Sequence, residues 1–275
     1  MNTLPKSKSS AGQALLVAVL AIAVSLIVVL SIISRSITDV AVSNKEDESL
    51  RAFSAAEAGV EKALITGSGQ GTTPLGNASF SSEVGVLQGT KAFVSPAKLL
   101  SGETMTVWFV SHNADGSVSS VCNGTYPCFA GTQMKVCWDQ DAAIEVSVYY
   151  GPASDMKIYR AAIDPDTSRG NNFSPVTGGS CDIGSYSFTH QKVVTFPIAA
   201  LAGLKFAKIR VLYNTVPVML GIDSTDVQVF PSQGTTITSS GLAGESNRKI
   251  SVSQSYNEPA AVFETGIYSG GGLIK

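Results

Sequence analysis

The stretch that decides the fold is AGQALLVAVLAIAVSLIVVLSIISRS, from Ala11 to Ser36. Residues 13–33 contain no charged side chain, and their polar members are one glutamine and two serines. A helix rises about 1.5 Å per residue, so about 20 residues cross a hydrocarbon core about 30 Å thick. The stretch therefore predicts a membrane-spanning helix over about residues 14–33.

The charges that flank this stretch bear on its orientation. Lys6 and Lys8 precede it and are expected to stay in the cytoplasm, although Arg35 on the other side weakens the asymmetry. A cleaved secretory signal has a shorter apolar region of about 7–15 residues, followed by a small-residue cleavage site. Here the apolar run is longer and the helical pattern continues past it. We expect the segment to be kept, with the N-terminus inside and the bulk of the chain outside.

The helical pattern continues through residues 34–65, which contain no proline and are rich in helix formers. Gly67 and Gly69 are stop signals, so we expect one long helix over 13–66. Its second half carries a stripe of large residues beside a stripe of small ones, and both can pack against a partner. The residues expected to pack are Leu50, Phe53, Ala56, Gly59, Val60 and Leu64. A coiled coil, or docking on the chain's own domain, is the alternative interpretation.

Composition restricts the function classes. The chain has 275 residues, a net charge of −2 and only 15% charged residues, with no block of Lys or Arg. The basic footprint of a nucleic-acid-binding protein is therefore missing, and no nucleic-acid partner is evident. Abundant Gly, Ser and Thr after Gly67 suit an extracytoplasmic β-rich domain.

The rest of the chain is expected to be mostly β-structure. We predict a Gly/Ser-rich connector over 67–102, a β-rich extracytoplasmic domain over 103–268 and a tail over 269–275. Apolar runs rich in Val, Ile, Tyr and Phe are expected as strands, namely 103–112, 142–150, 156–163, 190–198, 204–213, 226–231 and 248–256. The predicted fold class is α+β, with a long N-terminal helix followed by an antiparallel, sandwich-like β domain.

All four cysteines lie in the expected β domain, at Cys122, Cys128, Cys137 and Cys181. An even number in an exported domain favours two disulfides, for which three pairings are possible. We favour Cys122 with Cys128 and Cys137 with Cys181, because CNGTYPC resembles a small closed loop around a turn.

Catalytic and metal-binding signals are weak. The cysteines include no CxxC pair, and neither His112 nor His190 is near them in sequence, so we expect no zinc site. The run DPDTSRGNN, which begins at Asp164, opens like a calcium loop, but its glycine is one place late and Pro175 occupies the twelfth position, where a calcium loop has Glu. No nucleophile signature accompanies either histidine. We expect no cofactor, no metal and no enzymatic activity.

The N-terminal fifth of the chain resembles the type IV pilin-like proteins, specifically the PilX-type minor pilins and related pseudopilins. The resemblance lies in a short basic leader ending in Gly12, an apolar helix beginning QALLVAVL, and the run EDESLRAFSAAEAGVEKAL over 46–64. It implies that a prepilin peptidase cuts the leader, residues 1–12, between Gly12 and Gln13. It further implies that the helix first anchors the protein in the inner membrane and later joins the helical core of a filament.

Two positions depart from the family pattern. Most such proteins have Phe as the first mature residue and Glu as the fifth, whereas this chain has Gln13 and Val17. A carboxylate in lipid is costly unless it is paired, so Val17 removes both that cost and the pairing signal. In lacking this Glu, the chain resembles the family members that lie at or near the filament tip.

The resemblance and the residues together lead to one expectation of function. We expect a structural minor subunit of a type IV pilus or pseudopilus, with prepilin peptidase, other pilin-like subunits and the inner membrane as partners, displayed at the cell surface after assembly. The alternative is a single-pass membrane-anchored surface binding protein or adhesin that does not polymerise.

Overall fold

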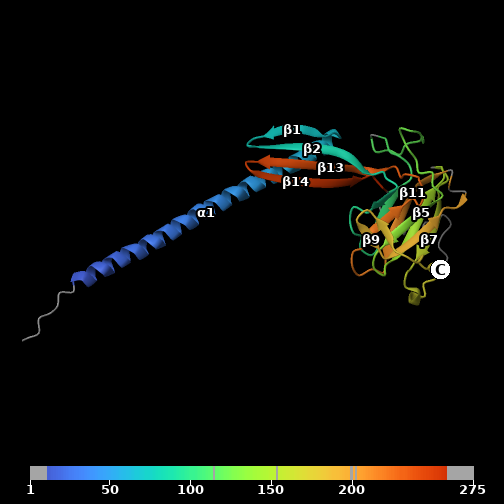
Figure 1. The fold of residues 1–275 in the computed structure, drawn as a ribbon. Helices are drawn as coiled ribbons and strands as arrows, with labels where there is room; N and C mark the ends of the chain where they lie inside the picture. Colours follow the sequence, from blue (N-terminus) through green and yellow to red (C-terminus); the bar gives the residue numbers. More distant parts are fainter. Residues whose placement is uncertain (1–10, 114, 153, 199–200, 202, 259–275) are drawn as a thin grey trace, which may run out of the picture. The chain divides into compact units, whose positions relative to one another are not determined.

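The chain consists of one long N-terminal helix followed by antiparallel β-sheet structure, as expected for an α+β protein (Figure 1). The computed structural model describes residues 11–113, 115–152, 154–198, 201 and 203–258. It divides into two units. The first comprises residues 1–83 and 238–250, and the second comprises residues 84–237 and 251–275. The predicted tail, 269–275, and most of the predicted leader lie outside the described residues.

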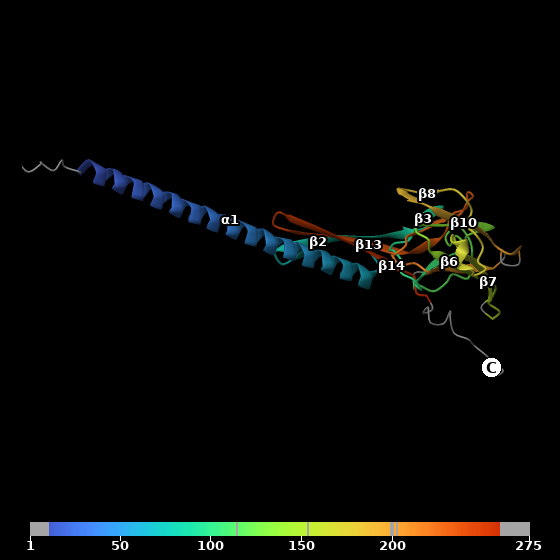
Figure 2. The ribbon, with the colours of Figure 1, turned by 90° about the horizontal axis from the view of Figure 1, so that it is seen from below.

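The first unit is built around helix α1 (Ala11–Thr66). Proline is absent from this span, and the helix ends where Gly67 takes a left-handed conformation (φ 64°) and donates its backbone N–H to the Ala63 carbonyl at 2.8 Å. Four strands form its sheet in the order β1-β2-β13-β14, with β1 (Gln70–Leu75), β2 (Ala78–Gln88), β13 (Ser232–Ala243) and β14 (Ser246–Ser255). The last part of α1 lies alongside this sheet (Figures 1 and 2).

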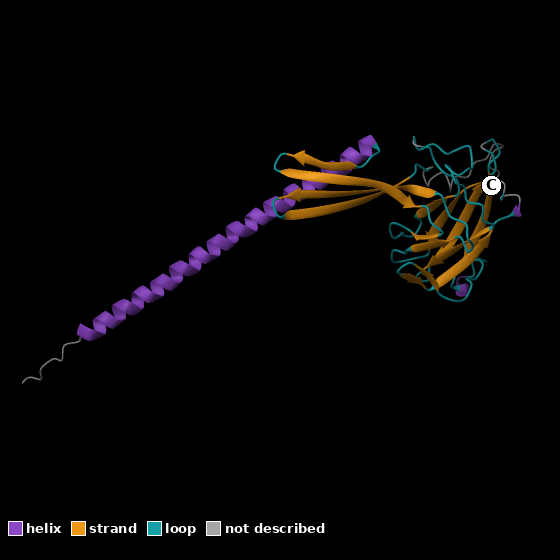
Figure 3. Cartoon of the chain, turned by 45° about the horizontal axis from the view of Figure 1, so that its top comes forward, coloured by secondary structure: helices purple, strands orange, loops and turns teal. Residues whose placement is uncertain are grey.

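The second unit contains two four-stranded antiparallel sheets. One has the order β10-β5-β12-β3 and the other has the order β4-β11-β6-β7, while β8 and β9 form a separate pair. Figure 3 shows these strands in orange. Their bounds are β3 (Ala92–Val94), β4 (Thr104–Trp108), β5 (Gln133–Trp138), β6 (Ala143–Tyr150), β7 (Lys157–Ile163), β8 (Cys181–Ile183), β9 (Tyr186–Phe188), β10 (His190–Thr195), β11 (Leu204–Leu212) and β12 (Leu220–Asp223).

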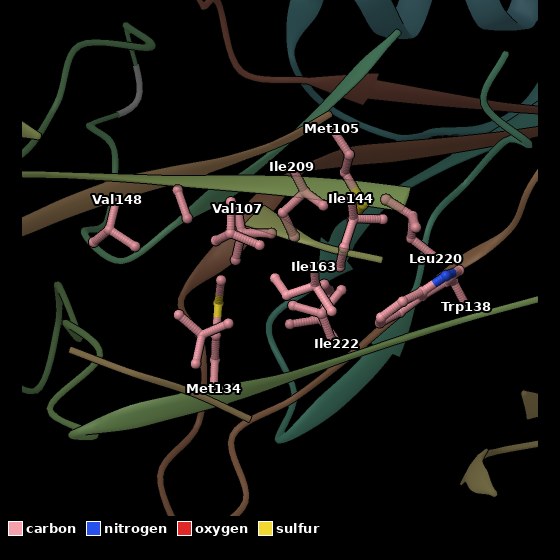
Figure 4. Close-up of a cluster of buried hydrophobic side chains, with 14 of the residues drawn as sticks. Met105, Val107, Met134, Trp138, Ile144, Val148, Ile163, Ile209, Leu220 and Ile222 are labelled. Carbon is pink, nitrogen blue, oxygen red and sulfur yellow. The ribbon is translucent and has the colours of Figure 1, made fainter. Parts of the chain in front are cut away.

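One hydrophobic core is shared by these two sheets (Figure 4). Strand β5 contributes Met134, Val136 and Trp138, and β11 contributes Ala207, Ile209 and Val211, all of them fully buried. Side chains alternate across a strand, so every second residue of each strand faces this core. The one polar atom of Trp138 is satisfied within the core, because its indole N–H donates to the Ala142 carbonyl at 2.8 Å.

Two expectations about β-structure are corrected. The segment 67–102 is not a plain connector, because β1, β2 and β3 lie within it. Its Gly and Ser residues serve the β1–β2 turn, where Gly76 has a φ of 59°, and the exposed face of the sheet. The run 226–231 is not a strand, because turn-type hydrogen bonds to Asp226 hold the chain between β12 and β13.

Candidate functional site

The N-terminal half of α1 presents an uncovered apolar surface. Its large hydrophobic side chains from Leu15 to Ile33 are between 49% and 69% exposed. Within it, the Ser25 hydroxyl donates to the Ala21 carbonyl at 2.8 Å, so this polar group needs no water. Among the described residues, α1 is the one helix long and apolar enough to cross a membrane, with a mean hydropathy of 3.2 in its most apolar window.

The C-terminal half of α1 is docked on the sheet of the first unit through very small residues. Ala52, Ala55, Ala56 and Ala63 are at most 1% exposed. Their separations of three, four and seven residues place them on one face of the helix. Small residues on this face allow the backbones of helix and sheet to come close. The sheet also has a glycine at this contact.

Two glycines lie where helix α1 and its sheet approach each other most closely. Gly241 of β13 faces the helix backbone, where an added Cβ would overlap the Ala52 carbonyl oxygen. Gly59 of α1 faces the sheet, where an added Cβ would overlap the Ser239 hydroxyl and come within 2.8 Å of the Phe80 ring. A side chain at position 241 would therefore have to move the helix from the sheet, whereas one at position 59 would have to displace the Ser239 and Phe80 side chains.

Polar contacts fasten the β13–β14 turn to the helix. The Glu48 carboxylate accepts the Glu245 backbone N–H at 3.2 Å, and the Arg248 guanidinium donates to the Ser49 hydroxyl at 2.6 and 2.9 Å. Gly244 has a φ of 55°, and an added Cβ there would overlap the Glu48 carboxylate. The turn therefore needs glycine both for its backbone conformation and for its approach to the helix.

The residues expected to pack on the helix fall into two groups. Ala56, Gly59 and Val60 are buried against the chain's own sheet. In contrast, Leu50, Phe53 and Leu64 are 68%, 45% and 46% exposed. At about 100° of rotation per residue, these three lie on a stripe beside the docked face. We call Leu50, Phe53 and Leu64 the exposed helix stripe.

The expected processing residues, Gly12 and Gln13, lie in the first turn of α1, which begins at Ala11. Residues 1–10 lie outside the described part of the chain.

The two disulfides are Cys122–Cys128 and Cys137–Cys181, which is the pairing favoured from the sequence. The first closes a small loop in which the Asn123 side chain accepts two backbone N–H bonds, both at 2.9 Å. The second joins β5 to β8, and both of its cysteines are buried. Disulfides persist in oxidising compartments, so this bonding fits an exported β domain.

The calcium-like run is held together by a guanidinium. The Asp164 side chain is 2% exposed and accepts hydrogen bonds from Arg169 and from the Asn171 amide, each at 2.6 Å. Arg169 also donates to the Asp141 carbonyl at 2.8 Å. Arg169 therefore supplies the positive charge beside Asp164. Among the described residues, no group of three or more potential ligands could hold a metal ion.

The two histidines lie apart in different surroundings. His190 begins β10, with its imidazole 3.7 Å from the Asp141 carboxylate. His112 follows β4 and is only 9% exposed, and burial lowers the pKa of its imidazole below the usual value of 6.5. Its ring stacks on Tyr256 with a centroid separation of 3.7 Å.

Sequence reasoning missed the residues on the sheet side of the helix contact. They include Phe80, which follows α1 closely in β2, and four residues that lie far along the chain from α1, namely Ser239, Gly241, Gly244 and Arg248. A single sequence contains no local signal that assigns a glycine in a strand to a distant helix.

Comparisons with known proteins add little. No family model matches the chain, and no curated protein matches it. Among solved structures, a chain described as "Structural analysis of an exo-beta-agarase" matches with a TM-score of 0.20 and 11% identity, covering 58% of this chain and 23% of its own. That likeness carries no argument about fold or function.

Proposed function

We propose that the protein is a PilX-type minor subunit of a type IV pilus or related pseudopilus. In this proposal α1 anchors the chain in the inner membrane, prepilin peptidase cuts between Gly12 and Gln13, and the helix then enters a filament built with other pilin-like subunits. The β-structure is displayed outside, and the two four-stranded sheets of the second unit are the faces of a sandwich. The role is structural, and it requires no catalytic residue or cofactor.

The observation that carries the proposal is the division of α1 into an uncovered apolar half and a docked half. The exposed side chains of the N-terminal half can face lipid or neighbouring apolar helices, because both surroundings are apolar. The docked half is covered on one side only, where the alanine face meets the sheet. The exposed helix stripe beside that face is available for a neighbouring subunit.

The absence of a carboxylate at Val17 supports a place near the filament tip. The resemblance assigns the usual Glu to pairing with a neighbouring subunit, and a Val cannot make that pair. A subunit with no neighbour ahead of it has no need of the pair. We therefore propose a low-copy, tip-proximal subunit.

The test is the N-terminal residue and intact mass of the mature protein, purified from a host that expresses prepilin peptidase. The wild type is expected to begin at Gln13, and a Gly12→Ala variant is expected to keep the leader. Ser10→Ala is the matched control and is expected to be processed like the wild type. An uncut chain in the wild type, or a cut after Ser25, would reject the proposal and leave a membrane-anchored or secreted binding protein.

A further inference from the structure

The second unit carries an unusual aromatic arrangement on one side of the sheet β4-β11-β6-β7. Tyr149, Phe206 and Trp108 occupy one row across three strands, since Phe206 pairs in register with both of the others. Their rings are in contact, with centroid separations of 4.5 Å for Tyr149 and Phe206 and 5.0 Å for Phe206 and Trp108. The next row on the same side includes Thr106 and Lys208. We call this side, which faces away from the core, the outer face.

The chain that leaves β14 lies on the outer face. Tyr256 stacks on His112, whose ring in turn meets Trp108 edge-on at 4.4 Å. Two residues further on, Glu258 accepts a hydrogen bond from the Thr106 hydroxyl and lies 3.8 Å from the Lys208 ammonium. We call residues 256–258 the strap.

His112 lies beneath the strap, and no described residue there satisfies the hydrogen-bonding capacity of its ring. Both of its ring nitrogens are buried and have no hydrogen-bond partner among the described residues. A neutral imidazole tolerates this at a cost, whereas a charged imidazolium without a partner must be hydrated. Burial lowers the pKa of His112, so the closed arrangement already favours the neutral ring.

Ionisable groups also lie on the elements around His112. They are Tyr256 and Glu258 on the strap, Lys208 on β11 and Asp115 in the turn after the histidine. None of them is hydrogen-bonded to the imidazole. The Glu258 carboxylate is engaged by Thr106 and Lys208, and Asp115 is engaged by Ser117.

The strap also closes a cleft. A hollow of about 120 Å³ is lined by Thr106, Trp108 and Gln233 from the body of the unit and by Tyr256 and Glu258 from the strap. The Gln233 amide is used to hold the edge of β4, because it bonds the backbone N–H and carbonyl of Trp108 at 2.7 and 3.0 Å. These two hydrogen bonds hold that wall of the cleft in place.

We propose that residues 256–258 are a pH-sensitive strap, which is closed on the outer face while His112 is neutral and is released when the ring takes up a proton. Release exposes His112 to water and opens the cleft beside Trp108. The sign follows from linkage. The open state binds a proton more readily than the closed state, so acidification below about pH 6.5 favours opening. Glu258 is the second anchor, through its pairing with Lys208.

The test is amide hydrogen exchange of the full chain in nonionic detergent micelles, with rates corrected for the intrinsic effect of pH. The reporter is the end of β14, where the Tyr256 N–H donates to the Gln233 carbonyl. Between about pH 7.5 and about pH 5.5, we expect its protection to fall by up to about tenfold, while that of β5 stays constant. Equal protection at both pH values would overturn the proposal.

Variants separate the strap from general acid sensitivity. His112→Phe keeps a ring for stacking but cannot take up a proton, so its β14 protection is expected to be the same at both pH values. His190→Gln is the matched control and is expected to respond like the wild type. If β5 protection shows that His112→Phe does not fold, His112→Asn serves in its place, with the same pH-independence expected. A wild-type response in the neutral variant would overturn the proposal.

Discussion

Gly241 of β13 lies directly against the backbone of Ala52 in α1, so closely that a single added carbon would overlap the Ala52 carbonyl oxygen. This contact fixes how near the helix lies to its sheet. It also explains why the docked face of the helix is made of alanines, since larger side chains would hold the two backbones apart.

Gly241→Ala is therefore expected to destabilise the first unit by about 2–3 kcal/mol, the cost of overpacking against a rigid backbone. The measurement is thermal unfolding of the full chain in micelles, followed by circular dichroism. Gly71→Ala is the matched control, because it changes a strand glycine of the same sheet that has open space around it. Equal unfolding temperatures for the two variants would contradict the close contact.

The two disulfides are expected to differ in their contribution to stability. Chain-entropy arguments give about 4 kcal/mol for Cys137–Cys181, with a separation of 44 residues, and about 2 kcal/mol for Cys122–Cys128, with a separation of 6. Burial of the first pair adds a packing loss when it is removed. Denaturant unfolding of the two double Cys→Ser variants measures the difference. A larger loss for the Cys122–Cys128 pair would contradict this ranking.

The helix could be predicted from the sequence because its signals are local. An uncharged apolar run, the absence of proline and a glycine at position 67 all act within a few residues of the elements they define. The predicted helix, 13–66, differs from α1 only at its start. The compact loop CNGTYPC is likewise a local feature, and its cysteines pair with each other.

What could not be predicted depends on contacts between distant segments. The stripe of alanines indicates a close partner, but nothing in the helix says that the partner is β13 of the same chain. Strand β13 itself is rich in Ser, Thr and Gly, so its apolar signal is weak, and pairing with β2 stabilises it as a strand. The surroundings of His112 likewise depend on a distant segment, because its ring stacks on Tyr256.

The ion pair of Asp164 and Arg169 is expected to stabilise the second unit. Asp164→Ala leaves the partly buried Arg169 without its main carboxylate, and because Arg169 retains some exposure we expect a loss of about 2–3 kcal/mol. Asp166→Ala removes a more exposed carboxylate 3.5 Å from the same arginine, and it is expected to cost less. Addition of calcium is expected to leave the unfolding temperature of the wild type unchanged. A calcium-dependent rise would contradict this account, because it would show that the folded chain binds the metal.

The exposed helix stripe gives the sharpest test of filament assembly. Phe53→Asp places a charge where the proposal puts a neighbouring subunit, and loss of one buried aromatic anchor is worth more than about 1.4 kcal/mol, or about tenfold in affinity. We therefore expect the amount of this subunit recovered with sheared filaments to fall by about tenfold or more. Phe53 is 45% exposed in the single chain, so the stability of the subunit itself is expected to change little. Lys62→Asp is the control, since it places a carboxylate at an exposed position on the opposite side of the helix from Phe53. If Phe53→Asp and Lys62→Asp are recovered with filaments in equal amounts, this stripe is not an assembly surface, and the surface must be sought on the apolar half of α1.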